Sequence, residues 1–453
     1  MRDIAVTLIV FGSLPFILRR PFIGILMWTW LGFMNPHRLA WGFSVTMPFA
    51  MIVGITTMLA LLFSREPKQI PWKRETVLLA LFLLWMLVTT SMSFYPQVAW
   101  DQFEKVTKIF VMIFVAMIML YTRERLIQLV WVIALSIGFY GVKGGIFTIT
   151  TGGGFQVRGP EGSFIAGNNE IGLALVMTIP LLYYLSQHAS RAWLKFPMLA
   201  AAILTSVAAL GTQSRGALLG MAGMGVFFWV KSRSKLKVTL LLLALTPVLL
   251  TFMPESWWDR MHTITDYEND ASAMGRIHAW KFAWYLASQR LWGGGFYCFQ
   301  EEIFRMYVPE FETVHDSHSI YFGVLGHHGF PGLAIFLMLI VCTWLSASAV
   351  IRVTRRYPDL KWLRDLMAMT QVSLVAYLTA GAFLGMQYFD YFYNLILLVV
   401  GARVVLERYL ASHAESGTQT GVDLRPDLSL AGRRPPVPVS SAMALPTPPQ
   451  GAR

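Results

Sequence analysis

The sequence predicts an all-α polytopic integral membrane protein with about 12 or 13 transmembrane helices. Of its 453 residues, 55% are hydrophobic, and the mean hydropathy is +0.54. Apolar runs of the length that a membrane-crossing helix needs follow one another along the chain, and basic residues gather in the short loops between them. A soluble core would not require so much apolar sequence.

The apolar runs are the predicted spans. They cover residues 4–18, 21–34, 46–63, 76–94, 106–121, 126–146, 170–187, 196–211, 216–230, 238–253, 319–350, 366–386 and 394–410. The first two are shorter than the roughly 20 residues of a crossing helix, so we expect a hairpin or a tilted pair. The first run lacks a small-residue cleavage site and leads into another apolar segment, so it is interpreted as a retained span and not as a signal peptide.

The basic loops predict the orientation of the chain. Lysine and arginine fill the loops around residues 65–74, 231–237 and 352–364, which places these loops in the cytoplasm. The opposite side then receives residues 95–105, 147–168, 212–215, 254–318 and 387–393. We therefore expect any chemistry to take place outside the cytoplasm.

Three parts follow from this pattern. Residues 1–146 are predicted to be N-terminal transmembrane helices, and residues 147–411 a transmembrane core that includes the long extracytoplasmic loop 254–318. Residues 412–453 are rich in Pro, Ser, Gly and Arg and have too little apolar surface to fold. They are predicted to form a disordered cytoplasmic tail.

Composition also argues against several kinds of function. The two cysteines, Cys298 and Cys342, lie in a loop and in an apolar run, so neither a disulfide framework nor a CxxC metal site is expected. The formal net charge is +12, but the basic residues lie in short inter-span loops, where they set orientation. A nucleic-acid partner is therefore not expected.

Loop 254–318 is predicted to contain an amphipathic helix in SAMGRIHAWKFAWYLA, which starts at Ser272. Ser272 is a favourable N-cap, and one helical stripe would carry Ala273, Ile277, Trp280, Trp284 and Ala287. Indole rings prefer the membrane interface. The helix could be only an interfacial anchor, or a lid whose Arg276 faces a lipid-borne anion.

The segment HDSHSIYFGVLGHHGFPG, residues 315–332, contains four histidines beside or within an apolar run, where polar groups are costly. We place His318 at the mouth of an extracytoplasmic cavity, because an imidazole with a pKa near 6.5 is a suitable base at neutral pH. Alternatively, His318 caps the helix or faces water. Asp316 could orient an imidazole or cap a helix.

Deeper in the same run, His327 and His328 would need partners, and one of them is expected to form a structural hydrogen bond between helices. A metal site is not favoured, because no carboxylate or cysteine lies at a recognisable ligand spacing. Gly329, Pro331 and Gly332 are expected to permit a kink and close helix packing. The stretch QYFDYFYN, residues 387–394, is interpreted as an aromatic belt, with stacking on sugars as the alternative.

Several of these residues together resemble a known family. His318 and Ser319, then nine residues, Gly329, two residues and Gly332 resemble the signature of bacterial O-antigen ligases and the related O-antigen polymerases. Arg215 with Leu219, in TQSRGALLG, resembles the second signature of that family, Arg followed four residues later by Leu. The set Ser272, Gly275, Arg276 and Trp280, and LWGGGF at 291–296, are also similar. The resemblance covers about residues 150–390.

The N-terminal stretch RRPFIGILMWTWLGFMNPHRLAWGF resembles a subgroup of O-glycosylation ligases associated with exosortase systems. The family resemblance implies a glycosyltransferase with no cofactor and no metal, which transfers a glycan from undecaprenyl pyrophosphate to a lipid A core sugar. Attack of the acceptor oxygen on the face opposite the diphosphate, with His318 as the base, should invert the anomeric configuration. The enzyme would act in the bacterial inner membrane, on the periplasmic face, with membrane lipids as its other contacts and no nucleic acid.

In this scheme His318 is the general base and arginines bind the pyrophosphate, since a planar guanidinium grips phosphate oxygens in pairs. Arg215 and Arg276 are the first choices, and Arg158 in GGGFQVRGPEGSF is a further one. Alternatively, Arg215 snorkels to lipid headgroups and the segment around Arg158 is an ordinary Gly-rich loop. The possible supporting residues are Asp316, Ser319 and Asn168.

Two other functions stay open. The first is a sibling reaction, either polymerisation of O-antigen repeats or transfer to a protein side chain. The second is transport, which would more often place charged groups at the mid-depth of broken helices and show paired halves. Here the charges cluster at one interface, which favours transfer over transport.

Overall fold

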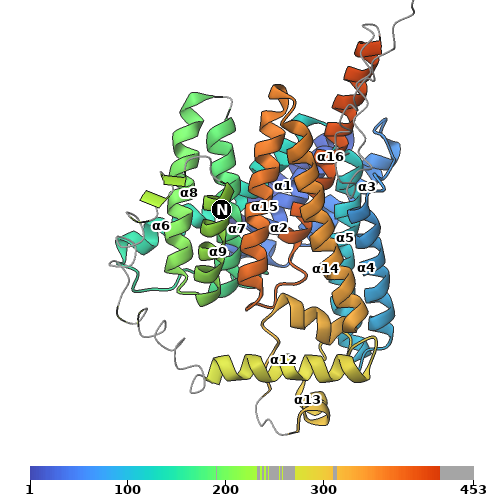
Figure 1. Cartoon of the computed structure of the whole chain (residues 1–453), viewed down its shortest axis with the longest axis vertical. Coiled ribbons are helices and arrows are strands. Elements are labelled where there is room, and N and C mark those ends of the chain that lie inside the picture. The colour runs from blue at the N-terminus through green and yellow to red at the C-terminus, as the bar shows by residue number, and fades with distance from the viewer. Residues whose placement is uncertain are drawn as a thin grey trace, which may run out of the picture. The chain divides into compact units, whose positions relative to one another are not determined.

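The computed structural model describes residues 1–189, 191–231, 271–309 and 314–418, and a few isolated positions between 235 and 258. In these parts the chain forms fourteen α-helices and three short 3-10 helices, and no strand (Figure 1). The prediction of an all-α polytopic membrane protein is confirmed. The predicted span 238–253 and most of the predicted tail lie outside the described residues.

The helices up to residue 231 are α1 (Arg2–Arg19), α2 (Phe22–Met34), α3 (Phe49–Phe63), α4 (Arg74–Ser91), α5 (Pro96–Met119), α6 (Arg123–Thr150), α7 (Asn168–His188), α8 (Ala192–Gly211) and α9 (Arg215–Lys231). They are followed by α12 (Ala271–Gln289), α13 (Glu301–Tyr307), α14 (Ile320–Thr354), α15 (Lys361–Gly381) and α16 (Asp390–Thr418). Residues Met1–Leu406 form one compact unit, and Glu407–Arg453 a second.

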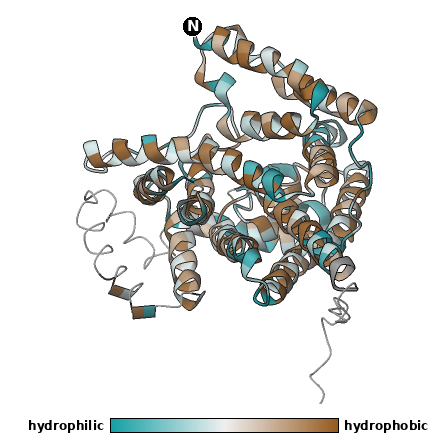
Figure 2. Cartoon of the chain, turned by 90° about the horizontal axis from the view of Figure 1, so that it is seen from above, coloured by the Kyte–Doolittle hydropathy of each residue, from teal (hydrophilic) through white to brown (hydrophobic). Residues whose placement is uncertain are grey.

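Five of the described helices, α4, α6, α7, α8 and α14, are long and apolar enough to cross a membrane, and shorter apolar helices include α2 and α3. Large apolar side chains such as Leu84, Phe196 and Ile203 are exposed on them, and hydrophobic residues cover outward faces of the helices (Figure 2). This is the surface expected of helices that face lipid. The total of 12 or 13 spans stays a prediction.

Within the first unit, small residues allow the helices to approach closely. Helix α6 packs against α8, and α15 packs against α7 and α9. A side chain in place of Gly141 or Gly145 on α6 would clash with Thr205 or with the backbone of Leu204 on α8. Close contact at small residues is the usual way in which helices associate in lipid, where no hydrophobic effect drives them together.

Helix α14 is broken within the span predicted for residues 319–350, at the position of the predicted kink. Gly329 has φ 65° and ψ −171°, so the chain breaks there into a short segment and a long one, which meet at a steep angle (Figure 1). A side chain at Gly329 would clash with the carbonyl oxygen of Leu291, because the Gly-rich loop 291–296 packs into the break. The predicted kink is therefore confirmed, and it makes room for this loop.

Helix α12 lies across one end of the other helices of this unit (Figure 1). Its buried face carries Ala279, Phe282, Ala283 and Leu286, which pack against residues such as Phe304 of α13. Trp284, on the predicted stripe, is 54% exposed. The predicted helix is therefore present. Ala287 of the predicted stripe is buried against protein while Trp284 is exposed, so a position of this stripe at the membrane interface stays a prediction. Ser272 lies within the first turn and is not the N-cap.

Three further predictions are corrected. Residues 96–105 are the first turns of α5 and not a loop, because Pro96 starts the helix well before its apolar part. Residues 412–418 continue α16 and do not belong to an irregular tail. The stretch 387–394 is no interfacial belt, since Tyr388, Tyr391 and Tyr393 are buried among neighbouring helices.

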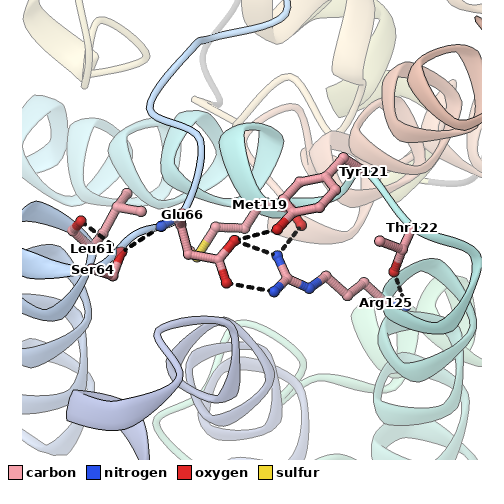
Figure 3. Close-up of polar contacts among 7 residues, drawn as sticks. All are labelled: Leu61, Ser64, Glu66, Met119, Tyr121, Thr122 and Arg125. Carbon is pink, nitrogen blue, oxygen red and sulfur yellow. Dashed lines mark hydrogen bonds and ion pairs between the residues drawn. The ribbon is translucent and has the colours of Figure 1, made fainter. Parts of the chain in front are cut away.

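A polar cluster connects the α3–α4 loop to the start of α6 (Figure 3). It lies near the N-terminal end of α4, away from α12 (Figure 1). Glu66 accepts two hydrogen bonds from Arg125, at 2.6 and 2.9 Å, and one from Tyr121 at 2.5 Å. Arg125 also donates to the carbonyl oxygen of Met119 at 2.9 Å. We name this group the Glu66–Arg125 cluster. The end of the helices that carries α12 is named the cavity end.

Candidate functional site

A cavity of about 400 Å³ opens at the cavity end, beside α7, α9, α12 and α15. Its described lining includes Arg158, Arg215 and Arg276, four amide side chains and no carboxylate. We name it the arginine cavity. Three arginines from three distant parts of the sequence, together with Asn168, therefore share one cavity, which makes the site electropositive.

Two helix N-termini add to this positive potential. Arg215 is the first residue of α9 and Asn168 the first residue of α7. Ser214 precedes α9: its Oγ accepts from the backbone N–H of Ala217 at 3.2 Å and donates to Asn169 at 2.6 Å. Asn168 donates to the carbonyl oxygen of Thr212 at 3.0 Å. These bonds join both helix starts at the cavity, and helix N-termini attract anions.

The backbone is strained beside this cavity. In the described chain only four residues other than glycine have positive φ, and they include Gln213 at 53° and His318 at 40°. Gln213 lines the arginine cavity, and its side chain donates to the carbonyl oxygen of Gly153 at 2.9 Å. Left-handed backbone at residues other than glycine persists only where the surroundings enforce it, and it concentrates at functional sites.

Helix α12 holds the loop of residues 315–319, which we name the His318 loop. Trp280 Nε1 donates to the carbonyl oxygen of Ser317 at 2.8 Å, and its indole stacks on Phe322 at 5.0 Å. A side chain at Gly275 would clash with the ring of His315. Two of the residues that carry the family resemblance, Gly275 and Trp280, therefore position this loop.

His318 carries a neutral imidazole at neutral pH. Although part of its side chain is exposed, desolvation by the surrounding protein lowers its pKa below the usual 6.5. The negative charges of Asp316 and Glu170 act in the opposite direction, and the positive charge of Arg276 lowers the pKa further. A neutral imidazole can accept a proton, which is the property a general base needs.

The predicted supporting residues lie close by without contacting the imidazole. Asp316 is exposed and accepts from the backbone N–H of Ser317 at 2.7 Å. Ser319 precedes α14, and its buried Oγ has no hydrogen-bond partner in the described part of the chain. Among the described residues no hydrogen bond joins either side chain to His318. Their predicted support would therefore act through charge or position.

His327 and His328 have structural partners, as expected. His328 Nδ1 lies 2.6 Å from Thr89 Oγ1, and its Nε2 lies 2.7 Å from the hydroxyl of Tyr388. The same hydroxyl lies 2.9 Å from His327 Nδ1. These bonds join α14 to α4 and to the segment before α16.

Several residues of the site were missed at the sequence level. Ser214 could have been found, because a serine directly before a helix start is a typical N-cap. Gln213, Glu170 and Tyr388 carried no such signal, since only the folded chain brings them beside the cavity or the histidines. The described residues contain no group of three or more His, Cys, Asp or Glu side chains that could hold a metal ion.

The fold and the site define a multi-pass membrane protein with an electropositive cavity beside a strained histidine loop. Residues 200–337 match the O-antigen ligase family, and residues 1–190 match a family of unknown function. No curated protein matches the chain. The matched stretch contains Arg215, Arg276 and His318. The stretch from residue 200 to 337 is therefore similar to the O-antigen ligase family, which supports glycosyl transfer of the ligase or polymerase type.

Proposed function

We propose that this protein transfers a glycan from undecaprenyl pyrophosphate to a sugar of the lipid A core, on the periplasmic face of the bacterial inner membrane. The observation that carries this proposal is the meeting of three arginines and two helix N-termini at one cavity beside His318. A diphosphate is the group that such a cavity would hold, because guanidinium forks and helix N-termini both favour phosphate oxygens.

The proposed reaction needs one proton transfer. The acceptor hydroxyl gives its proton to the imidazole of His318 while its oxygen forms a bond to the anomeric carbon of the donor. The bond between that carbon and the diphosphate oxygen breaks on the opposite face, and the electron pair leaves with the diphosphate. Arg215, Arg276 and Arg158 offset the charge that remains there, and the anomeric configuration inverts.

The direct test is transfer by purified protein in lipid nanodiscs, from undecaprenyl-pyrophosphate glycan to rough lipopolysaccharide, with chelator present. We expect transfer with inversion. Loss of transfer on addition of chelator would contradict the metal-free scheme. An undecaprenyl-pyrophosphate repeat and a peptide that contains serine and threonine serve as alternative acceptors. Exclusive transfer to the repeat would indicate a polymerase, and exclusive transfer to the peptide would indicate a protein ligase.

The proposed orientation has its own test. The basic loops support a cytoplasmic position for residues 65–74 and a periplasmic position for the segment around Glu301, which is exposed on α13. In a protein without Cys298 and Cys342, Glu301→Cys should react with a membrane-impermeant maleimide in intact spheroplasts. Lys68→Cys is the matched control and should react only after lysis. The reverse pattern would contradict the periplasmic site.

A further inference from the structure

A second cavity, of about 380 Å³, lies against the His318 loop, because Asp316 belongs to its lining. Most of its wall consists of aromatic rings and amide side chains. The rings belong to Phe164, Phe296, Tyr297, Phe299, Tyr388 and Phe389, and the amides to Gln102, Gln300 and Gln387. We name it the aromatic cavity. Its described lining contains no lysine and no arginine.

The two cavities therefore differ in charge. An anion has no cationic partner in the aromatic cavity, whereas an alkyl chain would leave three amide side chains without hydrogen bonds. A ligand with apolar faces and many hydroxyl groups satisfies both kinds of wall, and its hydroxyls can also donate to the carboxylate of Asp316. A sugar ring has this composition, because its C–H faces pack on aromatic rings while its hydroxyls bond to amides.

Gln387 provides a specific acceptor for such a ligand. Its side chain is 5% exposed, and its Oε1 has no hydrogen-bond partner among the described residues. Gly323 of α14 makes room for the amide, since a side-chain carbon there would lie 2.7 Å from Gln387 Nε2. The backbone is held as well, because the hydroxyl of Tyr393 donates to the carbonyl oxygen of Gln387 at 2.9 Å. A buried acceptor without a donor is costly, and a ligand hydroxyl would remove that cost.

His327, which also lines this cavity, can provide a second hydrogen-bond acceptor. When Thr89 donates its hydroxyl proton to the carbonyl oxygen of Met86 at 3.0 Å, its oxygen accepts from Nδ1 of His328, 2.6 Å away. His328 Nε2 then accepts from the hydroxyl of Tyr388, and Tyr388 accepts from His327 Nδ1. This chain of bonds leaves Nε2 of His327 with a lone pair.

The two cavities meet at the His318 loop. Leu384 lines the arginine cavity and Gly385 the aromatic cavity. A side-chain carbon at Gly385 would lie 3.5 Å from Asp316 Oδ2 and 3.9 Å from the Cα of His318. The proposed base thus stands at the boundary between a cavity suited to diphosphate and a cavity suited to a neutral sugar.

We propose that the aromatic cavity is the acceptor subsite and that it binds an uncharged sugar ring, with Gln387 and His327 as hydrogen-bond acceptors for its hydroxyl groups. The assignment of this cavity as an acceptor subsite rests on the proposed function. The binding of a neutral sugar at this cavity can, however, be measured without any transfer.

The test uses the full chain in nanodiscs and saturation-transfer NMR with a methyl glucoside as probe. We expect a signal that Gln387→Met weakens about 3- to 10-fold in affinity, the effect of one neutral hydrogen bond. Glucose 6-phosphate should bind no better than the methyl glucoside, because the cavity offers its phosphate no cation. Gln371→Met is the matched control: Gln371 is equally buried but bonds to Ser348 at 2.7 Å, away from the cavity. It should leave the affinity unchanged.

Should Gln387→Met fail to insert, the exposed Gln300 gives a second variant, Gln300→Ala, with the same expectation. Unchanged sugar affinity in both variants, or absence of the methyl glucoside signal in the wild-type protein, would overturn the inference. Sugar binding without any transfer from undecaprenyl pyrophosphate would contradict the proposed reaction and leave the sugar site standing. In an active protein, the KM for the acceptor should rise in Gln387→Met while the KM for the donor stays constant.

Discussion

The two ends of this unit place their arginines in different surroundings. In the Glu66–Arg125 cluster, both carboxylate oxygens of Glu66 bond to the guanidinium of Arg125, which also lies 4.5 Å from the ring centroid of Tyr121 (Figure 3). The described lining of the arginine cavity instead combines three arginines with four amide side chains, Ser214 and two helix N-termini.

This difference separates stability from function among residues of the same type. A guanidinium that a carboxylate holds in a bidentate pair has little left for a ligand, so its contribution is to the folded state. Three guanidinium groups and two helix N-termini around one cavity create a positive potential that favours an anion from outside the chain. The comparison therefore predicts activity effects at the cavity end and stability effects at the Glu66–Arg125 cluster.

The largest effect is expected for the histidines. His318→Gln should reduce kcat about 10²- to 10⁴-fold without changing the melting temperature, because an amide cannot take up the proton. His188 is the matched control, since its Nε2 lies 3.0 Å from Asp365 in a structural pair. His188→Gln should reduce thermal stability and leave kcat unchanged. Near wild-type turnover in His318→Gln would make the imidazole a positioning group.

The second largest effect is expected for the arginines. Lysine variants test whether the planar shape of the guanidinium matters in addition to its positive charge. Arg215→Lys and Arg276→Lys keep the charge but lose the fork, so transfer should fall about 10- to 100-fold, the effect of one or two charged hydrogen bonds. Arg125→Lys should instead lower the melting temperature and leave turnover per folded molecule constant. Full activity of both cavity variants would reduce these arginines to generic surface cations.

A smaller effect is expected on stability at the Glu66–Arg125 cluster. Glu66→Gln should cost about 1–3 kcal/mol, because it weakens a charged hydrogen-bond pair that is mostly buried. Hydrogen bonds from Arg125 lower the pKa of Glu66 below its usual 4.5. The ionised form is thus favoured by folding, so its stabilisation is present above pH 4.5 and is lost as the pH falls through the lowered pKa. Melting temperatures across this range, in wild type and Glu66→Gln, measure it; parallel curves would contradict the assignment.

The smallest effect concerns the pH dependence of transfer. Because desolvation lowers the pKa of His318, activity should fall on acidification only below pH 6.5, where the base becomes protonated. Asp316→Asn or Glu170→Gln removes a charge that raises this pKa, so either variant should move the acid limb of kcat/KM to lower pH. Arg276→Gln should move it to higher pH. An acid limb that none of these changes moves would exclude His318 as the titrating group.

Features that depend on local sequence were predicted well. Hydropathy gave the helical class, and Gly329 with Pro331 indicated the break in α14. The motifs also singled out Arg158, Arg215 and Arg276, which meet at one cavity. The same local reasoning missed the contact that Trp280 makes, because tryptophan near a membrane suggests an interfacial anchor. Trp280 instead bonds to the His318 loop, and no local pattern reports a partner 37 residues away.

By itself the sequence determined that this chain forms membrane helices, where several of them break or begin, and which arginines and histidines lie at one end of them. These properties depend on hydropathy, glycine, N-caps and charge, which act within a few residues. Only the tertiary structure decided that two cavities of different charge flank the His318 loop, and that Gln387 and Tyr388 lie beside His327. Such a site depends on side chains from helices far apart in the sequence, and their meeting is set by how the helices pack.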